Sequence, residues 1–254
     1  MWQPDGWDVR TRVGVLTPHG DIGPESELQA MAPDGVRVHA ARVPFGAMAT
    51  GGLMDPTIPL APVRAFVKPP AIDEAAALLA AAPIGAIGIG FTSSSYAGGP
   101  DAERKVVERL MQHTAGIPVV ATCAAAVTGF RHLDAGRIAL FDPPWFDAEL
   151  NRLGAEYFAS QGLEVVVHLP CQLPSAQRSI NPSDLFAWIV EHTPDDAEAV
   201  FIGGNGFRSV GVIAGLEEDL GRPVVTANSA LLWSLLHAAR SAARPTGYGE
   251  LFQH

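Results

Sequence analysis

The sequence predicts an α/β fold with two pseudo-symmetric halves, each a doubly wound, mostly parallel sheet, and a ligand site in the cleft between them. Short apolar runs alternate with helical segments along the 254 residues, as is typical of strands that helices bury on both faces. The pattern starts again about halfway along the chain, which indicates a duplication. In each half one buried strand ends in small polar residues, where such sheets bind ligands.

The first half is predicted to span residues 1–120. Its predicted elements, with the helix that follows it, are strands 12–17, 36–43, 84–89 and 117–122 and helices 73–82, 101–113 and 124–133. Pro83 ends the first of these helices, and Pro100 lies where the second can begin. Residues 44–70 are rich in Gly, Pro and Met and are expected to form a loop with little regular structure. A loop of that length is more often functional than idle.

The second half is predicted to span residues 121–254, and the C-terminal residues can pack back onto the first half. Its predicted elements are strands 137–143, 163–169, 199–202 and 223–226 and helices 149–161 and 182–191. Residues 137–143 repeat the pattern of residues 12–18, and residues 223–230 repeat that of 118–125. The repeats place the two halves about an approximate two-fold axis.

Two loops are expected to form facing walls of one anion site. The first contains the hydroxyl residues Thr92, Ser93 and Ser94 after a buried strand, and the second contains Gly204, Asn205, Gly206 and Arg208. The first N–H groups of a helix have no partner within it, so a polar strand-to-helix loop suits a carboxylate or a phosphate. The expected ligand is therefore a small mono- or dicarboxylate. Simple capping and tight turns would produce the same residues.

Three residues are candidates for moving a proton. His19 and Asp21 follow the first strand, and Cys123 follows the fourth. Burial would raise the pKa of a carboxyl such as Asp21 and suit it to general base catalysis, but Asp21 would serve equally well as a helix cap. Trp145 and Phe146, after the first strand of the second half, would supply an apolar wall, although aromatic residues are more often in the core.

Two other readings of the loops are weaker. The glycines from 203 to 206 half-match a dinucleotide-binding loop, but they follow the third strand of their half rather than the first. A hydrolase with a nucleophile among Ser93–Ser95 would need the G-x-S-x-G turn, which does not surround these serines.

Composition limits the partners. The net charge of −10 argues against binding to nucleic acid or to anionic membranes. The two cysteines form no zinc-ligand spacing and no disulfide framework, so no metal and no cofactor are expected. No leader or apolar run of membrane-spanning length is apparent, which favours a cytoplasmic protein. A homo-oligomer is compatible with these features.

Three motifs resemble a known family. Thr92-Ser93 follows the third strand, Pro-Pro-Trp-Phe-Asp-x-Glu-Leu-Asn occupies residues 143–151, and Gly-Arg-Pro-Val-Val-Thr-x-Asn occupies 221–228, before a Leu-Leu-Trp helix. Together they resemble the maleate isomerase and arylmalonate decarboxylase branch of the aspartate/glutamate racemase superfamily. The resemblance spans nearly the whole chain and implies the duplicated fold.

The resemblance also implies chemistry on a small carboxylic or dicarboxylic acid through an enolate-like intermediate, stabilised by Thr92, Ser93 and the backbone of Gly204–Gly206. The family uses one or two cysteines, and the matching positions here are Phe91 and Gly204. Asp21 stands where the family has an asparagine, and Trp145 or Phe146 where it has a tyrosine. The expected enzyme, an isomerase or decarboxylase, would therefore work without the usual thiols. The alternative is a carboxylate-binding or accessory protein of the same fold without catalysis.

Overall fold

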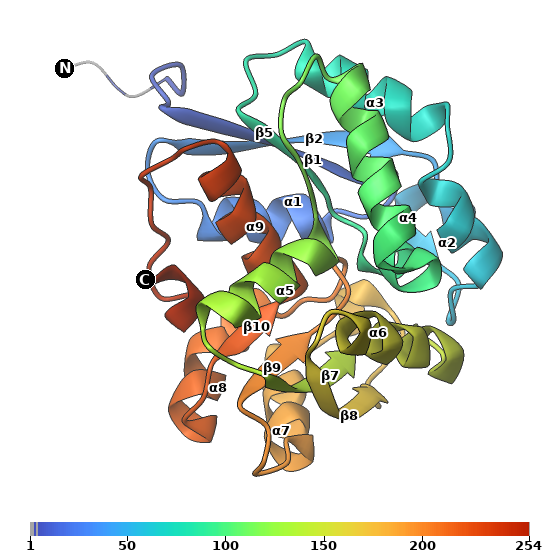
Figure 1. Cartoon of the computed structure of the whole chain (residues 1–254), viewed down its shortest axis with the longest axis vertical. Helices are drawn as coiled ribbons and strands as arrows, with labels where there is room; N and C mark the ends of the chain where they lie inside the picture. The colour runs from blue at the N-terminus through green and yellow to red at the C-terminus, as the bar shows by residue number, and fades with distance from the viewer. Residues whose placement is uncertain (1–2, 4, 254) are drawn as a thin grey trace.

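The computed structural model describes residue 3 and residues 5–253, and it contains two parallel four-stranded sheets (Figure 1). The first sheet has the order β2-β1-β5-β6, with β1 (Thr11–Pro18), β2 (Val36–Val43), β5 (Ala86–Ile89) and β6 (Val119–Ala121). The second has the order β10-β9-β7-β8, with β7 (Arg137–Asp142), β8 (Glu164–Pro170), β9 (Ala199–Ile202) and β10 (Val224–Thr226). Read from β8, the second order repeats the first, so the predicted pair of doubly wound halves is confirmed.

The helices cover both faces of each sheet. They are α1 (Gly23–Met31), α2 (Leu60–Phe66), α3 (Ala71–Ala80), α4 (Thr92–His113), α5 (Thr122–His132), α6 (Ala148–Ser160), α7 (Pro182–His192), α8 (Ile213–Leu220) and α9 (Ala227–Ala238). On the first sheet, α3 and α4 cover one face and α1 and α9 the other (Figure 1). Every residue of β5 and β9 is buried, as expected for strands enclosed on both sides.

Residues 44–70 differ from the sequence prediction. They contain a short hairpin, β3 (Met48–Ala49) and β4 (Leu53–Met54), and the helix α2, so the expectation of little regular structure is wrong. Pro62 is the third residue of α2, where the backbone N–H has no acceptor within the helix, so the proline does not break it. Val63 and Phe66 bury the inner face of α2.

Helix α4 also begins earlier than predicted, at Thr92 rather than after Pro100. Gly99 adopts φ 75° and ψ 171°, and this kink lets the chain pass Pro100 without continuous helical hydrogen bonding. Residues 92–98 therefore form a first helical segment whose amino end lies at the carboxyl end of β5.

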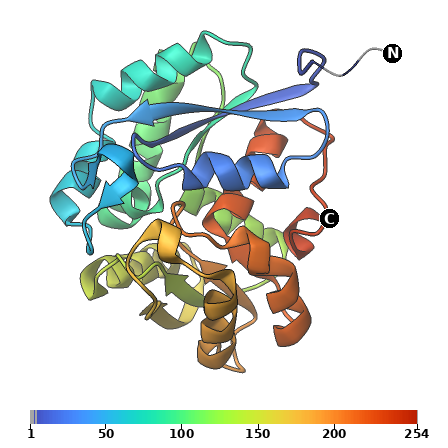
Figure 2. The same cartoon turned by 180° about the vertical axis from the view of Figure 1, so that it is seen from behind.

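The helix that follows the last strand of each sheet packs against the other sheet. Phe130 of α5 packs edge-on against Phe201 of β9, with ring centroids 6.0 Å apart. In the other direction, Leu231 of α9 lies so close to Gly88 of β5 that a Cβ on Gly88 would be 2.9 Å from Leu231 Cδ1. Helix α1 lies between the first sheet and the second half (Figure 2). The predicted division at residue 120 remains a prediction: it assigns both α5 and α9 to the second half, and of these α9 packs on the first sheet.

No helix among the described residues is long and apolar enough to cross a membrane.

Candidate active site

The carboxyl ends of β1, β5, β7 and β9 surround a small cavity of about 20 Å³. We call it the inner cavity. The residues that line it are Pro18, Asp21, Phe45, Met48, Met54, Ile58, Phe91, Thr92, Ser93, Trp145, Phe146, Gln177, Gly204, Asn205 and Gly206. Both halves contribute lining residues, because the carboxyl ends of the two parallel sheets face the same cavity. The wall is mostly apolar, with a few polar groups from the two predicted loops.

The structure brings most of the predicted residues to this cavity. Those at the inner cavity are Asp21, Thr92, Ser93, Trp145, Phe146, Gly204, Asn205 and Gly206. His19 and Arg208 are exposed and line a larger neighbouring cavity of about 940 Å³, the outer cavity. Ser94 lines a third cavity of about 270 Å³, and its hydroxyl donates to Phe91 O at 2.8 Å. Cys123 lines none of the three.

Ser93 presents a hydroxyl without a partner. Its side chain is only 1 % exposed, and no described residue forms a hydrogen bond with its Oγ. It is the second residue of α4, so it also lies at the positive end of that helix. Burying a hydroxyl without a hydrogen bond costs stability. Because the Ser93 hydroxyl has its hydrogen-bonding capacity unused, a ligand in the cavity could bond with it and remove that cost.

Asp21 supplies a buried carboxyl at the same cavity. Its Oδ1 accepts a hydrogen bond from Gly23 N at 2.8 Å, and the carboxyl also bonds with Gln177. Burial raises the pKa of Asp21 to about 6, although these hydrogen bonds and the nearby Arg42 oppose the rise. Such a carboxyl can both accept and release a proton near neutral pH.

Thr92 does not point free donors at the cavity. Asn205 Oδ1 accepts hydrogen bonds from Thr92 N at 2.8 Å and from Thr92 Oγ1 at 2.6 Å. An internal amide from the second half therefore occupies the first N–H group of α4. Of the two hydroxyl residues of this loop at the inner cavity, Ser93 is the one whose Oγ has no partner among the described residues.

A buried carboxylate orients that amide. Glu27 of α1 accepts hydrogen bonds from Ser209 N at 2.6 Å and Val210 N at 3.1 Å, and its Oε2 accepts one from Asn228 Nδ2 at 2.7 Å. Asn228 Oδ1 in turn accepts from Asn205 Nδ2 at 2.9 Å. An ionised carboxylate only accepts, so this order turns the oxygen of Asn205 toward Thr92. Burial raises the pKa of Glu27 to about 7.

The two positions that carry thiols in the resembling family are structurally closed here. Phe91 packs against Phe45 and Phe66, with ring centroids 4.9 Å and 4.1 Å away. Gly204 has φ 78°, and a Cβ there would lie 2.7 Å from Pro143 Cγ. An L side chain is therefore strained at residue 204 for conformational and steric reasons.

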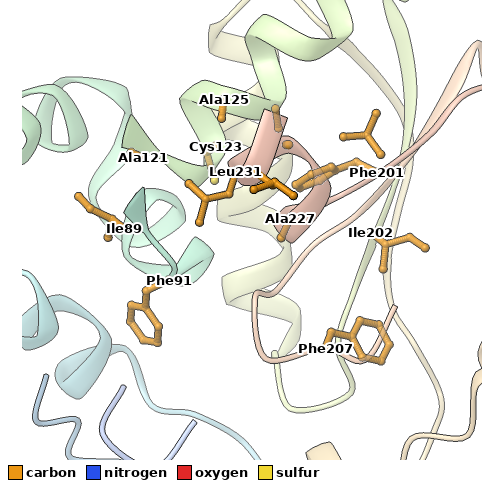
Figure 3. Close-up of a cluster of buried hydrophobic side chains, with 14 of the residues drawn as sticks. Ile89, Phe91, Ala121, Cys123, Ala125, Phe201, Ile202, Phe207, Ala227 and Leu231 are labelled. Carbon is orange, nitrogen blue, oxygen red and sulfur yellow. The ribbon is translucent and has the colours of Figure 1, made fainter. Parts of the chain in front are cut away.

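Cys123 is a core residue. It is fully buried among apolar side chains that include Ala121, Ala125 and Leu231 (Figure 3). Burial raises the pKa of its thiol well above the usual value, so a reactive thiolate is disfavoured. Its thiol donates a weak hydrogen bond to Thr92 O, at 3.8 Å. The prediction that Cys123 moves a proton finds no support in this geometry.

Sequence reasoning missed several residues of the site. Gln177 belongs to a short 3₁₀ turn (Gln177–Ser179), and Met48 and Met54 come from the hairpin, which the sequence did not predict. Glu27 lies in α1, which was likewise not predicted. A buried glutamate in a helix has no sequence signature of its own. Among the described residues, no group of three His, Cys, Asp or Glu side chains could hold a metal ion.

The comparisons with known proteins agree with this architecture. A maleate isomerase from Pseudomonas putida S16, in a cysteine-to-alanine variant crystallised with maleate, superposes with a TM-score of 0.82 at 24% identity, covering 95% of this chain and 97% of that chain. A maleate cis-trans isomerase from Nocardia farcinica with a covalently bound succinylcysteine superposes with a TM-score of 0.81 at 20% identity, covering 96% of this chain and 99% of that chain. Unliganded arylmalonate decarboxylase superposes with a TM-score of 0.78 at 19% identity, covering 96% of this chain and 99% of that chain. At these identities the structures define the fold class.

The family follows from the sequence match. The family model described as arylmalonate decarboxylase matches residues 67–252, most of the chain, so this protein belongs to the arylmalonate decarboxylase family. No curated protein matches it. The resemblance drawn from the three motifs is confirmed.

Proposed function

We propose that this protein is a cofactor-independent enzyme that transfers a proton at the carbon next to the carboxylate of a carboxylic acid. The observation that carries the proposal is the pairing of Asp21 and Ser93 in one inner cavity. Asp21 is a carboxyl with a pKa of about 6, and Ser93 has a buried hydroxyl that no described residue bonds. The family and the fold, whose relatives are named as isomerases and decarboxylases acting on small acids, support it.

Ser93 and the amino end of α4 would hold one carboxylate of the substrate. When a second carboxylate leaves as carbon dioxide, its carbon–carbon bond breaks and the electron pair forms an enediolate on the retained carboxyl. Negative charge then grows on oxygens beside Ser93, where a hydroxyl and a helix terminus stabilise it. Asp21, protonated, donates its proton to the carbon, and solvent restores it.

Decarboxylation with proton transfer fits this site better than isomerisation through thiol addition. A thiol route needs a nucleophilic sulfur at the cavity, whereas Phe91 and Gly204 supply none and Cys123 is enclosed. The apolar wall formed by Trp145 and Phe146 lowers the local polarity and favours the loss of a charged carboxylate as neutral carbon dioxide.

The test is turnover and hydrogen exchange in heavy water with a panel of substituted malonates and dicarboxylates. Wild type should release carbon dioxide or incorporate deuterium next to the carboxylate, and Asp21→Asn should lose at least 100-fold of that rate. Tight binding without release or exchange would overturn the proposal in favour of a carboxylate-binding protein. Cys123→Ser should keep the activity, and a folded Cys123→Ser variant without activity would contradict the assignment of Asp21.

A further inference from the structure

The inner cavity cannot hold a substrate by itself. A volume of about 20 Å³ is close to that of a single water-sized probe, whereas ligand pockets typically measure roughly 300–1,000 Å³. The outer cavity, at about 940 Å³, falls within that range. A substrate whose reacting carboxylate lies at Ser93 therefore needs a neighbouring space for the rest of its body.

The two cavities share a thin partition. Gln177 and Gly206 line both. The Gln177 side chain lies directly over Gly206, because a Cβ on Gly206 would overlap Gln177 Nε2 and come within 2.6 Å of Asp21 Oδ2. Gln177 also bonds with Asp21. This one side chain therefore lies between the two cavities, beside the carboxyl that we place in the reaction.

The outer cavity is lined by basic side chains in an acidic protein. His19, Arg178 and Arg208 line it, although the chain carries a net charge of −10. Neither Arg178 nor Arg208 forms a side-chain hydrogen bond or an ion pair within the described residues, and both are exposed. The only carboxylate in the lining is that of Glu27, whose oxygens are engaged by Ser209, Val210 and Asn228.

Apart from the hydroxyl residues Ser26 and Tyr248 and the amide of Gln177, the rest of the lining is apolar or bare backbone. Ile22, Ala30, Val210 and Val212 supply apolar surface, and several glycines expose the main chain. An apolar interior with cations at the rim matches an organic anion that carries an apolar body.

We propose that the substrate is an elongated organic anion that spans both cavities: the carboxylate retained in the reaction lies at Ser93 with the leaving carboxylate on the same carbon, the apolar body fills the outer cavity, and a further, distal anionic group binds Arg178 and Arg208. Gln177 is the gate between the two ends. The inference rests on the proposed function for the reacting end, whereas the distal end stands on the outer cavity and its arginines alone.

The experiment uses two matched probe series on the full chain: α,ω-dicarboxylates of four to ten carbons, and monocarboxylates of the same lengths that end in a methyl group. Calorimetric titration at low salt gives the affinity of each. We expect the longer diacids to bind at least tenfold more tightly than the matched monoacids. Arg178→Gln and Arg208→Gln together should abolish that difference without changing monoacid affinity, whereas Arg10→Gln, at an exposed arginine at the opposite end of β1, should leave it intact.

Two outcomes separate the claims. If long diacids bind no better than monoacids, or if the double arginine variant keeps the preference, the distal anionic group is wrong even where Ser93→Ala weakens both series. If Ser93→Ala changes neither series but the arginine variant removes the diacid preference, the outer site stands and the proposed reaction at Ser93 falls. Replacement of Gln177 by Ala should speed diacid association, and an unchanged association rate would remove Gln177 as the gate.

Discussion

Asn205 of the second half accepts two hydrogen bonds from Thr92 of the first, one from the backbone N–H at 2.8 Å and one from the hydroxyl at 2.6 Å. The contact joins the two loops that the duplication places opposite each other. It also satisfies, from within the protein, the N–H group that would otherwise face an anion at the start of α4. The contact is therefore structural, whereas the hydroxyl of the neighbouring Ser93 has no partner among the described residues.

Replacing Asn205 by Leu should lower the free energy of unfolding by about 2–4 kcal/mol, because the buried donors of Thr92 lose their acceptor. Urea unfolding measures the change. Asn181→Ala, which removes an exposed cap of α7, is the control and should cost about 1 kcal/mol. Equal losses in both variants would contradict the view that this amide holds the halves together.

Replacing Glu27 by Gln should destabilise the protein by about 1–3 kcal/mol at pH 8. The new amide N–H₂ would face Asn228 Nδ2, and turning Asn228 over would bring two donors together at Asn205. Ligand affinity should fall as well, since the order of these amides orients Asn205. Glu218→Gln, at an exposed position of α8, is the matched control for thermal melting and titration. An equally small effect of both changes would refute the view that Glu27 orients Asn228 and Asn205.

Ser93→Ala should weaken the binding of a carboxylate ligand by about 1.5–3 kcal/mol and leave the melting temperature nearly unchanged. The hydroxyl has no partner within the described protein, so folding loses no hydrogen bond when it is removed. Calorimetric titration and a thermal melt give the two quantities. Ser160→Ala, in the last turn of α6, controls for a general effect of losing a hydroxyl. A large fall in melting temperature with unchanged affinity would place the ligand elsewhere.

Asp21 should make stability depend on pH with a definite sign. Its pKa is about 6 in the folded protein against an ordinary value of 3.8, so between these pH values the folded state binds more protons than the unfolded state. The free energy of unfolding contributed by this group therefore falls as the pH rises from about 4 to about 6, by about 3 kcal/mol in total.

Asp21→Asn removes that dependence. The free energy of unfolding of the variant, taken relative to that of wild type, should rise by about 3 kcal/mol between pH 4 and pH 8, as measured by urea unfolding at both pH values. The pH profile of kcat/KM should show an inflection near 6 in wild type. Asp8→Asn, at an exposed carboxyl, should gain nothing. Parallel pH dependence of Asp21→Asn and wild type would show that the carboxyl is not held protonated by burial.

Restoring a thiol should have opposite consequences at the two family positions. Gly204→Cys places a side chain at φ 78° against Pro143 and should lower the melting temperature sharply. Phe91→Cys removes an aromatic ring from contact with Phe45 and Phe66, at a cost of about 3–5 kcal/mol, but it opens the inner cavity beside Ser93. Melting curves and the reactivity of the new thiol with an alkylating reagent distinguish the two variants. A stable, reactive Gly204→Cys protein would show that the loop can change its backbone conformation.

The strands of both sheets could be predicted from the sequence because a buried strand is marked by a short run of neighbouring apolar residues. The buried runs at residues 86–89 and 199–202 contain apolar residues at every position, as strands covered on both faces must. The repeat of the first strand at residues 137–143 predicted the second sheet. Helix α2 escaped prediction because its proline lies in the first turn, and α4 was shortened because Gly99 hides a kink that only the chain's path reveals.

The site was predicted as two loops, and its inner detail was not predictable. Thr92, Ser93, Asn205 and Gly206 follow strand ends, so their meeting at one edge is a consequence of parallel pairing. Which of them remains free for a ligand depends on hydrogen bonds between residues more than 100 positions apart, such as Thr92 to Asn205. No spacing in the chain encodes that pairing.

The sequence by itself determined the duplicated α/β fold and the place of the polar loops, because hydrophobic runs, prolines and small polar residues act over a few neighbouring positions. Only the tertiary structure decided that the Ser93 hydroxyl has no partner among the described residues, that Asp21 is a carboxyl with a raised pKa, and that Cys123 is part of the core. These properties depend on burial and on donors supplied by the other half. Desolvation and hydrogen bonding are set by what surrounds a group in space, whichever part of the chain provides it.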